Sequence, residues 1–322
     1  MFELKLRSQK KFLNFRLRKN RDRTGQQVRE ISTLSIVTSV FLKLLLLVFF
    51  SMIVLLPFFF MLFVAVMPKS QSDLLKSQFS FFPKEWVWRN FPDAIKGATS
   101  SYWTSFFLTS ANVILSIVLK VFVTMLAGYA FSIKTWRGKE FLWSLFISLL
   151  VLPEVALLTG QYKMVLFLDE IKIRQNFAGT VLTIALPFIA SIFNALMYRN
   201  AFEAIPNRIK EVAMVDGAVG AKYLFKIAMP MVTPTTLTIV ILTALASWNS
   251  YLWPALIAGT DYKIISVWLF DVGKDPNDDK RVDQSLKMAG AICAVLPMLL
   301  FYFLFRKRIM NAISRQGSTI KG

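Results

Sequence analysis

Hydrophobic residues in this chain gather in long uninterrupted runs, and charged residues are confined to the segments between them. Six runs carry few or no charges over roughly membrane-spanning length: Leu44–Met67, Gly97–Ile133, Phe141–Tyr162, Gln175–Tyr198, Ile227–Thr260 and Met288–Phe305. About 20 apolar residues in a helix are needed to cross about 30 Å of hydrocarbon. The pattern therefore predicts an all-α integral membrane protein with six transmembrane helices.

The same pattern predicts how the chain is divided. A basic tail (1–40), a first transmembrane helix (41–67) and an outer loop (68–103) precede a membrane domain at 104–305, and a short tail follows at 306–322. The first apolar run is longer than the roughly 7–15 residues of a signal-peptide core, so we expect it to remain as an anchor. Within the membrane domain we expect an inner loop at 199–235 and spans at about 106–132, 141–160, 178–198, 236–258 and 287–305. Pro230 and Pro234 are expected to break the fifth run, because proline removes a helical donor and clashes with the preceding turn.

The distribution of charge predicts the orientation. The net charge is +19; with the N-terminus inside, the inner segments (1–33, 133–140, 198–232 and 306–322) hold 23 Lys and Arg against 7 acids. The outer segments (68–103, 154–177 and 259–287) hold 13 against 12. By the positive-inside rule both termini are cytoplasmic, in a multi-pass protein of the cell membrane. Topology and contact with anionic lipid explain the basic residues, and no nucleic-acid partner is expected.

The composition excludes several kinds of chemistry. The chain has no His and a single Cys, Cys293, which rules out imidazole ligands, His-based triads and internal disulfides. Its two Gly-Lys pairs are followed by Glu140 and Asp275, whereas a phosphate-binding P-loop requires Ser or Thr there. We therefore expect no catalytic residue, no metal site and no cofactor on this chain, and no enzymatic activity of its own.

The inner loop contains an unusually polar stretch, "KEVAMVDGAVG", at 210–220. Pro206 suits the first turn of a helix, and Gly217 suits its end, because glycine tolerates the left-handed conformation found there. A second short helix is expected from about Ala218 to Met229. Two short helices that meet at a glycine would project into the cytoplasm and offer a docking element to a soluble partner.

This stretch resembles the EAA loop of permease subunits in binding-protein-dependent ABC importers. Glu211-Val212-Ala213, then Gly217, then nine residues to Ile227-Ala228-Met229-Pro230, match the family spacing, with Val212 and Met229 as apolar replacements. Asp216 makes the form most similar to the sugar-uptake branch of maltose and glycerol-3-phosphate permeases. The resemblance extends over about 80–322 and includes Leu152–Val155, Trp248–Tyr251, Met288–Ala291 and Ile320–Gly322, with Ser250 in place of the usual acid.

The resemblance implies the type I permease fold of ABC importers, with a cytoplasmic coupling helix that lies in a cleft of an ATPase subunit. Glu211 would offer its charge to that cleft, Ala213 would permit close approach, and Gly217 would set the turn, with Asp216, Ile227 and Pro230 completing the motif. It also implies a second permease subunit, two ATPase subunits that bind ATP and Mg²⁺, and an extracytoplasmic solute-binding protein. The solute would be a sugar or a glycerol-phosphate-type compound, moved by alternating access.

Four residues within or near the spans are candidates for the solute pathway. Trp248, Asn249 and Tyr251 fall in the outward half of the fifth span, where Asn249 needs a partner and aromatic rings suit sugars. Lys120 lies roughly a dozen residues from the inner end of the second span, about 18 Å deep at 1.5 Å per residue. The alternatives are an interfacial aromatic belt with a helix–helix hydrogen bond, and a structural lysine satisfied by nearby carbonyls and serines. Glu154 in the next span is a possible partner of Lys120, although it lies nearer the outer end.

Two other functional classes stay open on the sequence alone. A secondary transporter or channel would work without an ATPase, and such proteins usually carry paired intramembrane charges or inverted repeats. A membrane scaffold would recruit a soluble partner and move nothing. Co-purification with an ATPase, and uptake that depends on it, would separate the three classes.

Overall fold

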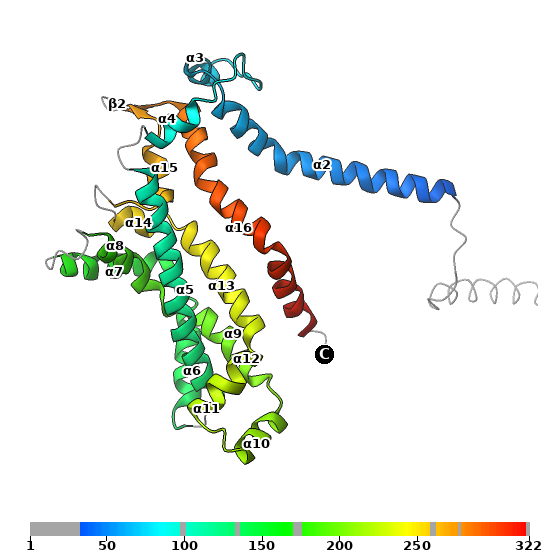
Figure 1. The fold of residues 1–322 in the computed structure, drawn as a ribbon, viewed down its shortest axis with the longest axis vertical. Helices are drawn as coiled ribbons and strands as arrows, with labels where there is room; N and C mark the ends of the chain where they lie inside the picture. The colour runs from blue at the N-terminus through cyan, green and yellow to red at the C-terminus, as the bar shows by residue number, and fades with distance from the viewer. Residues whose placement is uncertain are drawn as a thin grey trace, which may run out of the picture. The chain divides into compact units, whose positions relative to one another are not determined.

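The computed structural model describes residues 33–96, 101–132, 136–169, 176–257, 262–275 and 278–319. These residues are helical except for turns, loops and one two-stranded hairpin (Figure 1). The chain divides into two compact units, 1–58 and 59–322. The basic tail at 1–32 and the terminal residues 320–322 lie outside the described residues.

Three helices are long and apolar enough to span a membrane among the described residues: α2 (Thr33–Ala65), α5 (Tyr102–Ser132) and α16 (Gln284–Thr319). Their apolar parts are Val37–Ala65, Tyr102–Ser132 and Gln284–Lys307, which contain most or all of the first, second and sixth predicted spans. At 1.5 Å per residue each exceeds the roughly 30 Å of the hydrocarbon layer.

The fourth and fifth predicted spans are bent pairs of helices rather than straight rods. In the fourth, α8 (Phe177–Ala185) and the short η3 (Leu186–Phe188) meet α9 (Ile192–Glu203) at 61°. The span predicted at about 178–198 thus corresponds to a bent pair of helices. Pro187, the second residue of η3, has no backbone N–H to donate. The side chain of Ser191 caps the restarted helix by accepting from Asn194 N at 3.3 Å.

The fifth segment breaks where its prolines predict a break. The helices α11 (Ala221–Tyr223) and α12 (Met229–Met231), joined by the π-helical η4 (Leu224–Ala228), meet α13 (Thr233–Trp248) at 73°. The described part of the span predicted at about 236–258 is not one continuous helix. α13 ends at Trp248, Asn249–Tyr251 are non-helical, and a separate helix α14 covers Leu252–Ile257.

The third predicted span, 141–160, is two shorter helices, α6 (Lys139–Leu149) and α7 (Glu154–Asp169). Pro153 lies immediately before α7, and it interrupts the helix because the residue before a proline is disfavoured in the α-helical conformation. By length and composition the described residues contain three spans, or five when each bent pair is counted as one.

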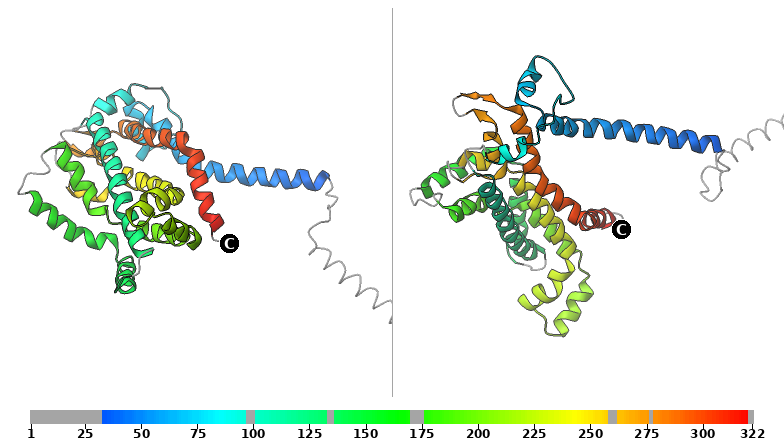
Figure 2. Two further views of the ribbon diagram at one scale, coloured as in Figure 1. Left: turned by 60° about the horizontal axis from the view of Figure 1, so that its bottom comes forward. Right: turned by 45° about the horizontal axis from the view of Figure 1, so that its top comes forward.

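The short elements lie at opposite ends of the second unit (Figures 1 and 2). One end carries α3 (Lys69–Asp73), η1 (Leu74–Lys76), α4 (Asn90–Lys96) and α15 (Ile265–Asp271), with an antiparallel hairpin of β1 (Lys274–Asp275) and β2 (Asp278–Val282). The other end carries α10 (Asn207–Val215), the helix over the EAA-like motif. The described parts of two segments predicted to be outer, 68–103 and 259–287, thus lie at the end opposite α10 of the predicted inner loop.

Helix α5 is the centre of that core and packs against α8, α9, α13 and α15. Toward the α10 end, Met125 of α5 belongs to one buried cluster with Tyr198, Phe202 and Ile239. Toward the other end, Leu108 shares a buried cluster with Trp253 and Ile257. The crossing with α9 is close, because a Cβ on Gly128 would lie 2.8 Å from Arg199 N and closer still to Tyr198 Cβ.

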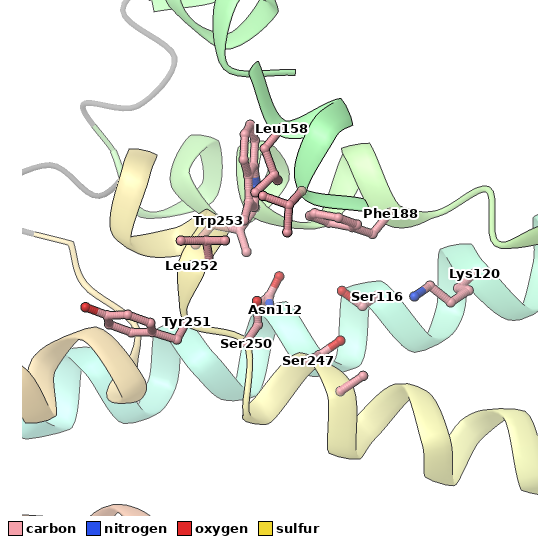
Figure 3. A pocket seen from close by; sticks show the side chains of 13 residues that line it. Asn112, Ser116, Lys120, Leu158, Phe188, Ser247, Ser250, Tyr251, Leu252 and Trp253 are labelled. Atoms are coloured by element: carbon pink, nitrogen blue, oxygen red, sulfur yellow. The ribbon is translucent and has the colours of Figure 1, made fainter. Parts of the chain in front are cut away.

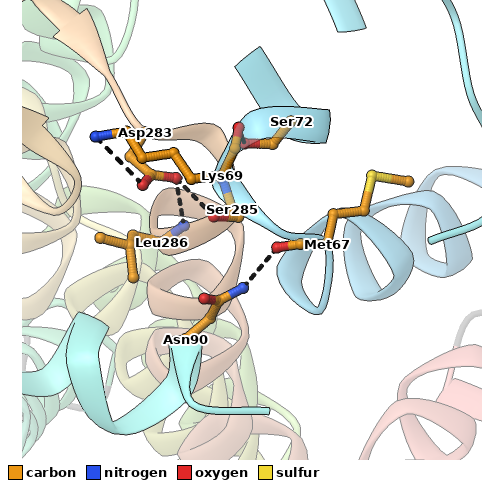
Figure 4. A network of polar contacts seen from close by, with 7 residues as sticks. All are labelled: Met67, Lys69, Ser72, Asn90, Asp283, Ser285 and Leu286. Carbon is orange, nitrogen blue, oxygen red and sulfur yellow. Dashed lines mark hydrogen bonds and ion pairs between the residues drawn. The ribbon is translucent and has the colours of Figure 1, made fainter. Parts of the chain in front are cut away.

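A polar network closes the end of the unit opposite α10 (Figure 4). The side-chain amide of Asn90 donates to the carbonyls of Ala65 and Met67, both at 2.9 Å. Asp283 caps the start of α16 by accepting from Ser285 N at 3.0 Å and Leu286 N at 3.2 Å. The carboxylate of Asp283 also pairs with Lys69 at 3.9 Å. The network therefore joins the end of α2, the outer loop and the beginning of α16.

Candidate functional site

The EAA-like motif forms a helix and a turn that project from the core, and we call residues 206–232 the α10 hairpin. Pro206 precedes α10, and Ala213 is buried, at 3% exposure, in the cluster that holds Tyr223 and Leu224. Ile227 packs against the same cluster, whereas Pro230 is exposed at the start of the bend. The apolar members of the motif that face inward thus hold the hairpin to the core.

The turn after α10 is a Schellman motif. Gly217 has φ +67°, its N–H donates to Met214 O at 3.1 Å, and Ala218 N donates to Ala213 O at 2.8 Å. These are the two bonds that satisfy the last carbonyls of a helix when the next residue is left-handed. The predicted left-handed conformation of Gly217 is confirmed.

The second helix of the hairpin begins later than the sequence suggests. It starts at Ala221 rather than Ala218, because Gly220 has φ +59° and ψ −127° and cannot belong to a helix. The prediction placed the start of this helix wrongly by three residues. Two positive-φ glycines, not one, shape the hairpin.

The surface of the hairpin combines exposed apolar side chains with charge. Glu211 and Asp216 are exposed, and so are four large apolar side chains, which we call the α10 apolar face: Val212, Met214, Val215 and Val219. Val215 is 87% exposed. Contiguous exposed apolar residues with a charged rim are typical of a surface that meets another protein.

A cavity of about 280 Å³ lies beside the middle of α5 (Figure 3). Helix α5 supplies a polar wall, and α7, α8, η3, α13, α14 and the link between α13 and α14 supply the rest. The lining residues are Asn112, Ser116, Lys120, Val155, Leu158, Ile184, Phe188, Ala246, Ser247, Ser250, Tyr251, Leu252 and Trp253. In Figure 3 the α5 side chains face Trp253, Leu158 and Phe188 across the space. Hydroxyls, one side-chain amide and aromatic rings therefore line one half-open cavity.

Two of the four predicted pathway residues line this cavity. Lys120 and Tyr251 do, and the Tyr251 ring also lies 4.4 Å from that of Phe270. Trp248 and Asn249 do not line it: the Trp248 ring packs 6.1 Å from Phe106, and the exposed Asn249 donates its side-chain amide to Leu245 O at 2.9 Å. The side chain of Glu154, the suggested partner of Lys120, lies outside the described residues.

The sequence interpretation missed most of the polar lining. Asn112, Ser116 and Lys120 are four residues apart, so they share one face of α5. The buried Ser105, Thr109 and Thr124 extend the same face along the helix. A polar stripe at helical spacing within an apolar span was the signal that could have found the site.

Two atoms on the cavity wall are buried without a hydrogen-bond partner among the described residues. They are Asn112 Oδ1 and Trp253 Nε1, in side chains that are each 2% exposed. Leaving such an atom unpaired costs about 1–3 kcal/mol of folding free energy. A buried polar atom without a protein partner requires an explanation, and a water or a ligand bound in the cavity provides one.

The long apolar helices and the bent helix pairs indicate a multi-pass membrane protein. No family model matches the chain. It is 41% identical over 306 residues to a probable ABC transporter permease protein of Mycoplasma pneumoniae, covering 92% of this chain and 93% of that relative. The chain therefore belongs to the ABC transporter permease family.

More distant relatives have names that refer to the transport of sugars. It is 23% identical over 277 residues to the arabinooligosaccharides transport system permease protein AraQ of Bacillus subtilis, covering 84% of this chain and 92% of AraQ. Its fold resembles a chain in the crystal structure of a bacterial ABC transporter involved in the import of the acidic polysaccharide alginate. That match has a TM-score of 0.66 and 19% identity, and covers 88% of this chain and 99% of the other.

Proposed function

We propose that this chain is one of two permease subunits of an ATP-driven importer that carries a sugar or a glycerol-phosphate-type solute across the cell membrane. Six membrane segments, with α6–α7 as the third, would place both termini and the α10 hairpin in the cytoplasm, as the distribution of Lys and Arg favours. ATP and Mg²⁺ would bind to two partner ATPase subunits. A second permease, an extracytoplasmic binding protein and membrane lipid complete the assembly.

The α10 hairpin is the observation that carries this proposal. Its exposed apolar face is a surface that a partner protein can cover. The exposed Glu211 on the same surface provides a charge that can orient that partner. Ala213, Gly217 and Ile227 act by holding the hairpin in shape, while Asp216 and Pro230 lie exposed at its turn and bend. ATP-driven closure of the ATPases would then favour one of two arrangements of the spans, which is a coupling of two equilibria.

The test is capture of the ATPase and ATP-dependent uptake by the purified complex in proteoliposomes. We expect Glu211→Lys to weaken ATPase capture at least tenfold, about 1.4 kcal/mol, because a like charge would face a basic cleft. Asp73→Lys is the matched control, since Asp73 is exposed at the opposite end of the unit and undergoes the same charge reversal.

Uptake of radiolabelled lactose, maltotriose and arabinotriose, with and without ATP, decides between the functional classes. Uptake that proceeds equally without ATP would instead favour a secondary transporter or channel. ATPase capture without any uptake would favour a scaffold. Normal capture by the Glu211→Lys variant contradicts the role assigned to the hairpin.

The four pathway candidates are proposals of unequal support. Lys120 and Tyr251 contact the cavity, which supports a place on the solute route. Trp248 and Asn249 stand where α13 ends, so a gate role would depend on movement of this break, and a structural role is the alternative. Alanine variants of Trp248 and Asn249 in the same uptake assay separate these alternatives, because only a gate role predicts a changed uptake rate.

A further inference from the structure

The cavity beside α5 presents two unpaired hydrogen-bonding atoms of opposite kind on opposing walls. Asn112 Oδ1 is an acceptor on α5, and Trp253 Nε1 carries a donor on α14. Both side chains are 2% exposed, and neither atom has a partner among the described residues. A bound molecule that carries both O–H groups and acceptor oxygens would satisfy the two atoms together.

The other residues that line the cavity limit which kind of molecule can bind there. Ser116, Ser247 and Ser250 add hydroxyls, whereas Trp253, Tyr251 and Phe188 add aromatic surface (Figure 3). A sugar ring has hydroxyls around its edge and an apolar C–H face, so it matches a wall of hydroxyls opposite a wall of rings. At about 280 Å³ the cavity is near the lower end of ligand pockets, so it fits one ring rather than a long chain.

We propose that this subunit itself binds one ring of the transported saccharide, with a ring hydroxyl donating to Asn112 Oδ1 and a sugar oxygen accepting from the Trp253 indole N–H. The inference rests on the proposed function, because it names the solute class and the residues that hold it. It assigns solute recognition to this permease rather than to its partner alone.

Other buried atoms without described partners provide a control. Thr243 Oγ1 is buried and has no partner among the described residues, yet Thr243 does not line the cavity. Thr243→Val removes that hydroxyl at nearly constant volume. Trp253→Phe likewise removes the indole N–H and keeps an aromatic ring, and Asn112→Leu removes the amide and keeps the side-chain size.

The first measurement is thermal unfolding of the purified full chain with lactose, maltotriose or arabinotriose, because binding to the folded state raises Tm without requiring ATP. We expect at least one saccharide to raise Tm of the wild type and of Thr243→Val. The Tm shift should be lost in Trp253→Phe and Asn112→Leu. Asn112→Leu removes an unpaired buried atom at nearly constant size, so its Tm without sugar should be equal or higher, which separates lost binding from misfolding. Trp253→Phe also removes buried ring volume, so its Tm without sugar should be lower, and its Tm shift with sugar is measured from that baseline.

The second measurement is ATP-dependent uptake by the reconstituted complex. We expect KM to rise about tenfold in Trp253→Phe and in Asn112→Leu, with kcat changed less, and to stay within twofold in Thr243→Val. ATP-dependent uptake with KM unchanged in both cavity variants overturns the inference and leaves the proposed function standing. Saccharide binding that the cavity variants abolish, without any ATP-dependent uptake, supports the inference and overturns the proposed function.

Two further outcomes also overturn the inference. One is the absence of any Tm shift with all three saccharides in the wild type, which would mean that the polar atoms serve only the folded core. The other is a larger Tm shift with glycerol 3-phosphate than with any saccharide, which would assign the cavity to a small anion.

Discussion

Gly217 and Gly220 sit at the two ends of the short link between α10 and α11, and their backbones make different demands. Gly217, at φ +67°, lies in the left-handed helical region, which asparagine also visits. Gly220 has φ +59° and ψ −127°, the conformation of the first central residue of a type II′ turn, which strongly favours glycine. A Cβ at either position would meet nothing within 4 Å, so backbone strain alone decides the effect of a substitution.

We expect Gly217→Asn to be tolerated and Gly220→Val to be damaging. The valine should lower the free energy of unfolding by roughly 1–3 kcal/mol and reposition the α10 apolar face, so ATPase capture should fall. The asparagine should lower it by only about a few tenths as much. Thermal unfolding and ATPase capture of the two variants, measured side by side, check the prediction. Equal loss in both would show that the two glycines share one requirement.

At the scale of single residues, the sequence predicted those features that follow from the spacing of a motif. The EAA-like spacing located Gly217, and its positive φ follows from the helix end. The conformation of Gly220 was not predictable, since the same letter is compatible with a helix start or a turn. Trp248 and Asn249 looked like pathway residues because of their chemistry, but the end of α13 turns them away from the cavity that their neighbour Ser250 lines.

Two helices of the core, α5 and α9, cross at a glycine. A Cβ at Gly128 would lie 2.8 Å from Arg199 N and 2.9 Å from Ala195 O, both of which belong to the backbone of α9. Backbone atoms cannot turn aside as a side chain can, so a larger residue must separate the two helices. The crossing also positions Met125 and Tyr198, which share the buried cluster that holds the α10 hairpin.

We expect Gly128→Ala to destabilise the protein by about 1–3 kcal/mol, although alanine is the better helix former. Gly160→Ala in α7 is the control, because a Cβ there meets nothing within 4 Å and should stabilise by about 0.5–1 kcal/mol. The opposite signs of the two changes in Tm are the readout. A Gly128→Ala variant as stable as the control would mean that α5 and α9 are not closely packed.

Hydropathy located the apolar segments but could not reveal which of them are interrupted. The third, fourth and fifth segments are each broken at or near a proline: Pro153, Pro187 and Pro230. Only the last break was predicted, because only the fifth run was too long for one helix. Within a run of ordinary length, a proline is compatible with either a kinked or an interrupted helix, and tertiary packing decides between them.

At the scale of the whole molecule, the proposed function requires the two ends of the second unit to respond to each other. The α10 hairpin lies at one end, and the network of Asn90 and Asp283 closes the other (Figures 1 and 4). Between them, α5 carries its polar stripe past the cavity. If an ATPase moves the hairpin, the movement is transmitted to the cavity only when the helices are held together at the end opposite α10. Under the proposed function, the network is therefore a condition for coupling.

Asn90 is the residue that tests this condition. It is 8% exposed, and its amide donates to the carbonyls of both Ala65 and Met67, which are themselves fully buried. Leucine has nearly the same size but no donor, so Asn90→Leu leaves two buried carbonyls unpaired. At about 1–3 kcal/mol for each unsatisfied group, the variant should unfold at a clearly lower temperature.

The matched control is Gln78→Leu, an exposed amide in the same loop, which should change stability by less than about 0.5 kcal/mol. If the network supports coupling, Asn90→Leu that is still folded at the assay temperature should keep ATPase capture, because the α10 hairpin is distant and intact. The number of solute molecules that it takes up per ATP hydrolysed should nevertheless fall, because the network end of the unit would no longer move together with the α10 end. Unchanged uptake per ATP in a destabilised variant would limit the network to a structural role and place the coupling elsewhere in α5, α9 and α13.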